Sequence, residues 1–143
     1  MDQQLLRLLG QDARQNSETL GNQLKVSAAT VRRKIIKLIQ SDVLRIIGVV
    51  DPDKVDLPVT VLIGLDVAPK KLESAMKLLG SRPEITWVST TTGRFDIIAK
   101  GWFASTSDLS KFMTIELADI KGLKDSETFI CLNVMKGYHR PFP

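Results

Sequence analysis

The chain has 143 residues, 43% of them hydrophobic and 25% charged, which is ordinary for a globular protein of one domain or two small ones. Its single cysteine excludes an internal disulfide, and one cysteine with one histidine leaves little from which to build a zinc site. The first residues have no signal-peptide pattern, and no apolar run approaches the length of about 20 residues that a membrane span requires. We therefore expect a soluble cytoplasmic protein without membrane contact, metal or cofactor.

The positive charge is concentrated in the first third of the chain. The net charge is +4, and residues 1–50 carry eight Lys and Arg against four acidic residues, whereas residues 51–143 carry twelve of each kind. An excess of cations in one region favours a polyanionic partner for that region. The first 50 residues are therefore the candidates for nucleic-acid binding.

Three helices are predicted in the first 40 residues. Four leucines give residues 2–10 a broad apolar side. Asn16 or Ser17 can cap a second helix, because a short side-chain oxygen accepts an otherwise unpaired backbone N–H. Ser27 is the natural cap of a third helix, which spans residues 28–40. Two short helices joined by a tight turn predict a helix-turn-helix.

The third predicted helix has an apolar back and a basic front. Val31, Ile35 and Leu38 recur at helical spacing and must face a core. Two cations fall almost opposite that stripe, which suits the DNA major groove. A surface helix whose cations are merely solvated has the same pattern. The candidate DNA-contacting residues of this region are Ser27, Thr30, Arg32, Arg33 and Lys37.

A β-branched segment and a linker follow the third helix. Asp42 tolerates the left-handed conformation that can turn the chain, and residues 43–50 are predicted to form a strand or one arm of a hairpin. Three helices followed by a hairpin predict a winged helix-turn-helix over residues 1–50, with Arg45 of the wing as a candidate phosphate contact. Residues 51–58 contain two prolines and three acids, a composition typical of a linker.

The second half of the chain predicts a different architecture. Pro69 begins one helix, and Ser105 with Asp108 forms a capping box before another. The order strand, helix, strand, strand, helix, strand predicts an α+β, ferredoxin-like domain over residues 59–136, followed by a tail at 137–143. The last strand has apolar residues on both sides, so an open apolar sheet face would favour a homodimer. The predicted strands span residues 59–67, 84–91, 95–102 and 127–135.

Taken together, these features resemble the Lrp/AsnC family of transcriptional regulators, also called feast/famine regulators. The resemblance covers nearly the whole chain and rests on order and spacing more than on any single motif. The matching residues are Asp2 with the LLRLL run, Asp12-Ala13-Arg14, Leu20, Val26-Ser27, Val31-Arg32-Arg33, Leu38, Ile46, Gly48, Asp51-Pro52, Gly93-Arg94-Phe95-Asp96, Gly122-Leu123 and Thr128.

The resemblance implies a regulator that binds double-stranded DNA and forms homodimers, which in some arrangements assemble into octamers. It also implies that residues 59–136 form an amino-acid-sensing domain similar to the ACT fold, with the effector held between subunits near the 93–96 turn. Gly93 would let backbone N–H groups approach a carboxylate, which Arg94 would also reach. Asp96 would receive an ammonium group, and Thr128 would add a hydroxyl. The alternative is a simple hairpin turn that needs glycine and is capped by Asp96.

Three residues depart from the family pattern. Lys25 stands where the family usually has a turn glycine, Gly21 replaces an alanine, and Asp42 replaces the glycine after the third helix. Gly21 is expected to weaken its helix by up to about 1 kcal/mol relative to Ala. These departures keep a second interpretation open, in which the protein is an effector-binding adaptor that no longer binds DNA.

An enzymatic function is not expected. Cys131 lies within a predicted strand and His139 lies in the tail, so they offer no nucleophile and base held by a third group. Some relatives of this fold act as tetrapyrrole decarboxylases and use histidines. A chain with one late histidine fits that activity poorly, which makes it the less favoured alternative.

Overall fold

A computed structural model describes residues 2–134 of the chain, and these residues fall into two compact units. The first unit lies within residues 2–49 and the second within residues 50–134. Each unit has its own cluster of buried hydrophobic side chains. The tail expected at residues 137–143, with His139, lies outside the described residues. No helix among the described residues is both long enough and apolar enough to cross a bilayer.

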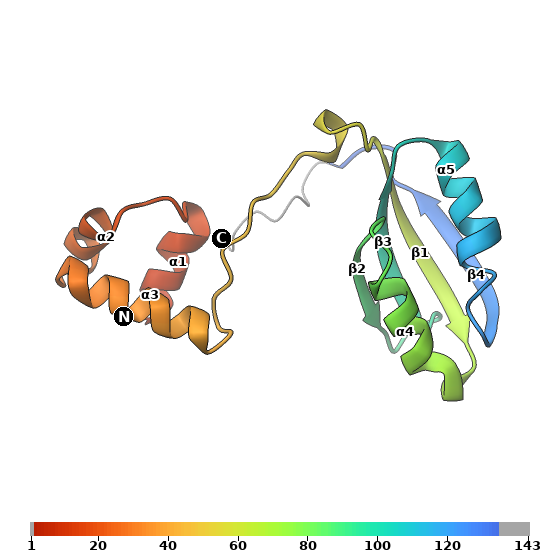
Figure 1. The fold of residues 1–143 in the computed structure, drawn as a ribbon, viewed down its shortest axis with the longest axis horizontal. Helices are drawn as coiled ribbons and strands as arrows, with labels where there is room; N and C mark the ends of the chain where they lie inside the picture. Colours follow the sequence, from red (N-terminus) through yellow and green to blue (C-terminus); the bar gives the residue numbers. More distant parts are fainter. Residues whose placement is uncertain (1, 135–143) are drawn as a thin grey trace. The chain divides into compact units, whose positions relative to one another are not determined.

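The first unit consists of three helices, as the sequence predicts: α1 (Asp2–Gln11), α2 (Ser17–Leu24) and α3 (Ala28–Gln40) (Figure 1). Asn16 caps α2, with its Oδ1 atom accepting a hydrogen bond from the Thr19 N–H at 2.8 Å. Ser27 caps α3 in the same way, with its Oγ atom 3.2 Å from the Thr30 nitrogen. The buried residues of this unit are Leu5, Leu9, Leu20, Val31 and Leu38.

Two non-glycine residues at helix ends adopt the left-handed conformation. Lys25 ends α2 with φ of 56°, and its N–H bonds to the Asn22 carbonyl. Asp42 turns the chain after α3 with φ of 54°, which confirms the turn predicted there. The departures from glycine at both positions therefore leave the backbone of the helix-turn-helix in place, at the cost of some strain at Lys25.

The role of Gly21 goes beyond its effect on the helix propensity of α2. Gly21 is buried, and a Cβ atom built on it would lie 2.7 Å from the carbonyl oxygen of Val26. The turn between α2 and α3 folds back directly onto this glycine, and the Val26 N–H bonds to the Gly21 carbonyl at 2.9 Å. Glycine therefore suits this position, because it allows the turn to pack against the helix.

The strand predicted over residues 43–50 does not form within the described chain. The segment begins with the N–H groups of Val43 and Leu44, which both bond to the Leu38 carbonyl at 3.0 Å. Beyond that point the backbone pairs with no strand of the described residues. A strand requires a second strand to accept and donate its backbone hydrogen bonds, and among its described residues the first unit contains only helices. Five β-branched side chains are exposed here: Val43, Ile46, Ile47, Val49 and Val50.

The second unit is a four-stranded antiparallel sheet with two helices on one face (Figure 1). The strands β1 (Val59–Val67), β2 (Ile85–Thr90), β3 (Ile97–Phe103) and β4 (Leu123–Ile130) lie in the order β2-β3-β1-β4. The helices are α4 (Leu72–Gly80), which follows a 3-10 turn at Pro69–Lys71, and α5 (Thr106–Lys111), which continues into a π-helical turn at Phe112–Glu116. This is the predicted ferredoxin-like βαββαβ arrangement.

The core of the second unit lies between the helices and one face of the sheet. Val61, Ile63 and Leu65 of β1 alternate toward this core and are fully buried. Ser105 caps α5 as predicted, since its Oγ atom accepts from the Asp108 N–H at 3.1 Å and donates to the Asp108 carboxylate at 2.6 Å. The opposite face of the sheet carries no helix in the described residues and exposes Leu62, Trp87 and Phe129.

The last strand begins four residues earlier than predicted. The sequence predicts it over residues 127–135, whereas β4 spans Leu123–Ile130 and pairs with β1 from Val67 to Val61. Gly122, with φ of +84°, turns the chain into this register, and its carbonyl accepts the Ala68 N–H at 2.8 Å. The residues at 124–127 are polar and therefore do not show the apolar pattern by which a strand is predicted. They are polar because β4 is an edge strand whose side chains are partly solvated.

Candidate functional site

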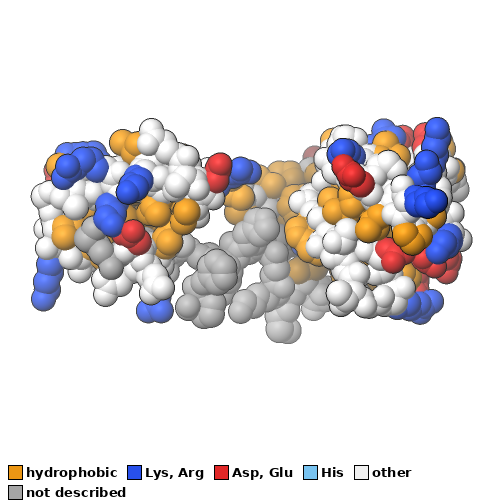
Figure 2. All heavy atoms as spheres, turned by 90° about the horizontal axis from the view of Figure 1, so that it is seen from below, with side chains coloured by type: hydrophobic (Ala, Val, Ile, Leu, Met, Phe, Trp, Pro, Cys, Tyr) orange, Lys and Arg blue, Asp and Glu red, His pale blue; other side chains and the backbone are white. Residues whose placement is uncertain are grey.

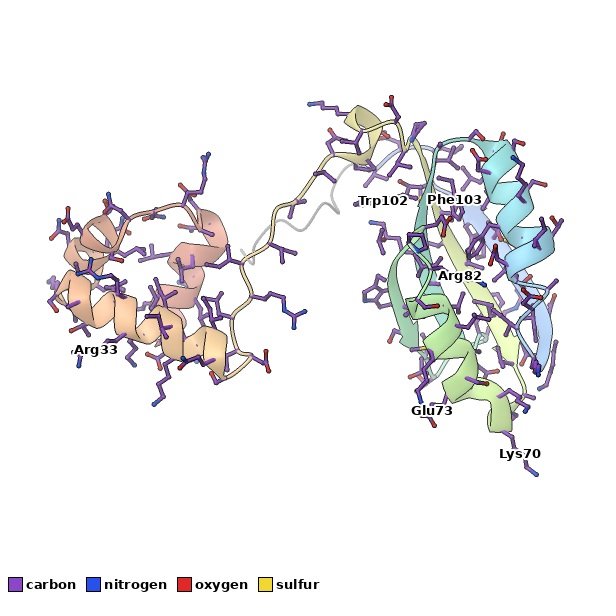
Figure 3. All side chains as sticks on the ribbon, in the orientation of Figure 1. Arg33, Lys70, Glu73, Arg82, Trp102 and Phe103 are labelled. Carbon is purple, nitrogen blue, oxygen red and sulfur yellow. The ribbon has the colours of Figure 1, made fainter. Side chains whose placement is uncertain are left out.

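The outer surface of α3 presents cations. Arg33 and Lys37 are exposed, and neither forms an ion pair within the described residues. Figure 3 shows Arg33 projecting away from the other helices of its unit. Lys34 lies between them in sequence and forms an ion pair with Asp2 of α1. These residues border a shallow hollow of about 450 Å³, lined further by Thr30, Leu38 and Ser41.

The beginning of α3 is small and polar. Ser27 and Thr30 are joined by a hydrogen bond of 2.9 Å between their hydroxyl oxygens, and both lie near the helix N-terminus, where backbone N–H groups favour anions. Arg32 is exposed beside them. Lys and Arg side chains are spread over the face of this unit that Figure 2 presents, with acidic side chains at fewer places. Arg45 is exposed on the unpaired 43–50 segment, not on α3.

A second feature is the turn between β2 and β3. The chain folds back at residues 93–96 onto the end of β1, where the Asp96 N–H bonds to the Leu65 carbonyl at 3.0 Å. The Oδ2 atom of Asp96 accepts the Val67 N–H at 2.9 Å. This backbone hydrogen bond, together with the charge of Lys124, lowers the pKa of the Asp96 carboxyl.

Glycine is not needed for the backbone of this turn. Gly93 does not adopt the left-handed conformation, and a Cβ atom built on it would meet nothing within 4 Å. The interpretation of this residue as a glycine required by a tight hairpin therefore has no support in the local geometry. The position instead leaves open space beside an exposed turn.

Arg94 and Phe95 lie over the face of the sheet that has no helices. A Cβ atom on Gly64 of β1 would overlap the Phe95 ring, so the ring covers that glycine. The Arg94 guanidinium lies 5.1 Å from the centroid of the same ring, a cation–π contact. Its Nη1 atom also lies 3.3 Å from the Oε2 atom of Glu127 on β4.

The interaction of Glu127 with Arg94 is electrostatic. The Oε2 atom of Glu127 is shielded from solvent and has no hydrogen-bond partner in the described residues, although Arg94 is within ion-pair distance. The 3.3 Å separation therefore brings the charges together without the alignment that a hydrogen bond requires. One acceptor position on this carboxylate remains unused.

Thr128 lies on the other face of the sheet. It pairs with Ile63, whose side chain points into the helix-side core, and its Oγ1 atom donates to the Met113 sulfur at 3.2 Å. Glu127 pairs with Gly64, and cross-strand neighbours share a face, so its side chain lies on the side of Phe95. Of the four predicted effector residues, the structure joins Gly93, Arg94 and Asp96 in one turn and directs the Thr128 hydroxyl elsewhere.

Comparison with known proteins identifies the family. Residues 60–141 match the model of the Lrp/AsnC ligand binding domain, which is more than half of the chain. The chain belongs to the Lrp/AsnC family. Its fold agrees with that assignment, because it joins a helical unit that contains a helix-turn-helix to a four-stranded ferredoxin-like unit.

Relatives and solved structures match nearly the whole length of the chain. An uncharacterised HTH-type transcriptional regulator of Pyrococcus horikoshii is 29% identical over 99% of this chain and 91% of its own length. The structure of Escherichia coli AsnC superposes with a TM-score of 0.83 at 26% identity, covering 96% of this chain and 95% of that one. A Neisseria meningitidis regulator, solved in complex with L-Met, has a TM-score of 0.88 at 19% identity and covers 99% and 94% of the two chains.

This Lrp/AsnC protein is a transcriptional regulator with a ligand-binding domain. Sequence reasoning missed Glu127, Phe95 and Gly64 as parts of the surface around its 93–96 turn. The missing signal was the register of β4. In the observed register, which shifts by one residue between Asp66 and Val67, Glu127 lies opposite Gly64 and Thr128 lies opposite Ile63. The described residues contain no cluster of His, Cys, Asp or Glu that could hold a metal ion.

Proposed function

We propose that this regulator binds double-stranded DNA through α3 and that a small amino acid, bound near the 93–96 turn between subunits, changes its assembly and thereby the DNA sites it occupies. The single observation that carries the DNA-binding part is the surface of α3. Arg33 and Lys37 are exposed without acidic partners in the described residues, on the helix that follows the turn at Lys25. We expect the protein to act in the cytoplasm.

The charged and polar side chains of α3 support contacts of this helix with DNA phosphates and bases. The helix has no acidic residue in its first turn, and Ser27 and Thr30 present hydroxyls there. Cations that neutralise DNA phosphates release counterions, so the affinity should fall steeply as salt rises. Arg32 can reach either phosphates or base edges from the flank of the same helix, and Arg45 can add a phosphate contact from the 43–50 segment.

The uncovered face of the sheet supports a homodimer. Leu62, Trp87 and Phe129 are each between 39% and 50% exposed on strands β1, β2 and β4, a concentration of apolar area that a monomer would leave in water. A second copy that places its own sheet on this face would bury these side chains by two-fold symmetry. Dimers of such dimers, up to an octamer, would then bring turns from different subunits together.

The effector part of the proposal is supported by the 93–96 turn. Gly93 leaves open space beside the turn. Neither the backbone conformation nor the packing of this chain requires a glycine at this position. Arg94 supplies an exposed cation next to it. The structural neighbour from Neisseria meningitidis was solved with L-Met, so a regulator of this fold holds an amino acid.

The DNA-binding proposal is tested by fluorescence anisotropy with DNA fragments selected from a genomic library by the full-length protein. We expect an Arg33→Ala/Lys37→Ala double variant to lose at least about tenfold in affinity and to have a shallower salt dependence by about two phosphate contacts. A matched control, Arg7→Ala/Arg14→Ala, removes the same charge from exposed positions outside α3. Equal affinities of the two double variants would mean that α3 is not the DNA-binding helix, and no binding by the wild type would favour the adaptor interpretation.

The dimer is tested by sedimentation of the full chain. Phe129→Asp introduces a charge on the uncovered sheet face and should convert the dimer to a monomer at micromolar concentration. Ile115→Asp is the control, because Ile115 is 60% exposed on the π-helical turn in the helix layer. A Phe129→Asp variant that sediments like the wild type would exclude this face as the interface.

A further inference from the structure

We infer that the ammonium group of the effector is bound by Glu127 and its carboxylate by Arg94, so that a zwitterionic α-amino acid binds by replacing the ion pair between these two side chains. This inference rests on the proposed function, in which an amino acid binds at the 93–96 turn. It differs from the expectation drawn from the sequence, which gave the ammonium group to Asp96.

The Asp96 carboxylate is already used to hold the turn in place. Its Oδ2 atom accepts the Val67 N–H at 2.9 Å, and the Asp96 main chain bonds both to Leu65 and to Thr91. A ligand that took this carboxylate would compete with the hydrogen bond that anchors the turn to β1. Asp96 is therefore a positioning residue, which fixes Arg94 and Phe95 over the sheet.

Glu127 is a carboxylate on the same surface that does not hold the turn in place. It projects from β4 beside the Phe95 ring, because it pairs with Gly64, which that ring covers. Its Oε2 atom is shielded from solvent yet accepts no hydrogen bond within the described residues. The Glu127 side chain is 40% exposed as a whole, but a shielded oxygen that accepts no hydrogen bond is unfavourable, and an ammonium group would donate one to it.

Arg94 is free to change partners. Its side chain is 73% exposed, and it approaches Glu127 at 3.3 Å without a hydrogen bond. Exposed ion pairs contribute little to stability, so the separation of the two side chains is readily compensated by new contacts. The guanidinium keeps its contact with the Phe95 ring, which limits the positions available to it and keeps it beside the open space at Gly93.

The chemistry of this pair specifies the ligand class. A cation and an anion next to each other match a molecule whose carboxylate and ammonium are carried by one carbon atom, which is an α-amino acid. A guanidinium binds a carboxylate through two parallel hydrogen bonds. Compounds that lack either charge would leave one of the two protein charges without a partner, so the N-acetyl and the amide derivatives should both be rejected.

The test is calorimetry with the full-length protein and each of the twenty amino acids, followed by the N-acetyl and amide derivatives of the one that binds best. We expect Glu127→Gln, which preserves the shape of the side chain, to weaken binding of that amino acid at least about tenfold, a change of about 1.4 kcal/mol. Arg94→Gln should have a comparable effect. The matched control is Asp125→Asn, which removes one negative charge from the same face of the same strand, two residues away.

The outcomes separate this inference from the function on which it rests. Binding that is lost in Glu127→Gln and Arg94→Gln, retained in Asp125→Asn and absent for both derivatives supports the inference. An affinity in Glu127→Gln equal to that of the wild type overturns it while the effector site at the turn survives. Wild-type protein that binds none of the twenty amino acids overturns the inference together with the proposed effector response. Unchanged tryptophan fluorescence would show that each variant is folded, since Trp87 and Trp102 both lie in this unit.

Discussion

Gly21 of α2 lies directly against the carbonyl group of Val26, so close that a Cβ atom on the glycine would be 2.7 Å from the carbonyl oxygen. A substitution to alanine would improve the helix propensity of α2 by up to about 1 kcal/mol. It would also force the turn away from the helix, and overpacking of this kind costs about 1–3 kcal/mol. The packing effect is the larger of the two.

Gly21→Ala should therefore destabilise the helical unit, by about 1 kcal/mol. Urea unfolding followed by circular dichroism of the helices measures this change, while tryptophan fluorescence reports the other unit, which contains Trp87 and Trp102. Gly48→Ala is the control, because a Cβ atom there meets nothing within 4 Å. An increase in stability of Gly21→Ala would show that the turn accommodates a methyl group.

Lys25→Gly should stabilise the same unit. Lys25 adopts φ of 56°, a conformation that costs a residue with a Cβ atom about 1 kcal/mol and costs glycine nothing comparable. Part of that gain is lost because glycine is more flexible in the unfolded chain, so the net increase should be about 0.5 kcal/mol. Lys25→Ala, which removes the charge but keeps the Cβ atom, should show no such gain in urea unfolding.

Asp2→Asn should strengthen DNA binding. Asp2 forms an ion pair with Lys34, which partly neutralises a cation beside Arg33 and Lys37, and it lines the same hollow. Loss of this carboxylate would free Lys34 and should raise the affinity about a few-fold at low salt, with a steeper salt dependence. Asp12→Asn, which frees Arg14 on the link between α1 and α2, should change the affinity less. Anisotropy titrations at several salt concentrations would show whether the two variants differ.

The stability of the sheet unit should depend on Asp96 in acid. The pKa of this carboxyl is lowered, chiefly by the hydrogen bond from the Val67 N–H, so its ionised form stabilises the folded state. That contribution is present above the ordinary aspartate pKa of about 3.9 and is lost as the pH falls through the lower folded-state value.

Asp96→Asn keeps an acceptor oxygen for Val67 but does not titrate. The variant should therefore unfold at a lower temperature than the wild type at neutral pH, and the difference should shrink below about pH 4. Thermal unfolding followed by tryptophan fluorescence measures it, with the exposed Asp119→Asn as control. A temperature difference that stays constant from neutral pH to about pH 3 would show that the Asp96 charge does not contribute.

Local patterns in the sequence predicted most of the elements. Helical spacing of leucines and β-branched residues gave α1 and α3 to within a residue, and the caps at Asn16, Ser27 and Ser105 form the predicted hydrogen bonds. Such features depend on residues three or four positions apart, so they are readable before the chain folds. The strand predicted for the wing at residues 43–50 does not form in the described residues. A strand needs a second strand with which to pair, and the composition of a segment does not show whether one is present.

By itself, the sequence determined the order of the helices and of the four strands of the sheet, the basic outer side of α3 and the family. The tertiary structure decided which side chains meet. A shift of one residue in the pairing of β4 with β1 would exchange the faces of Glu127 and Thr128, because successive residues of a strand point in opposite directions. That register includes an irregularity between Asp66 and Val67, and pairing between segments so distant in the sequence forms only when the chain folds.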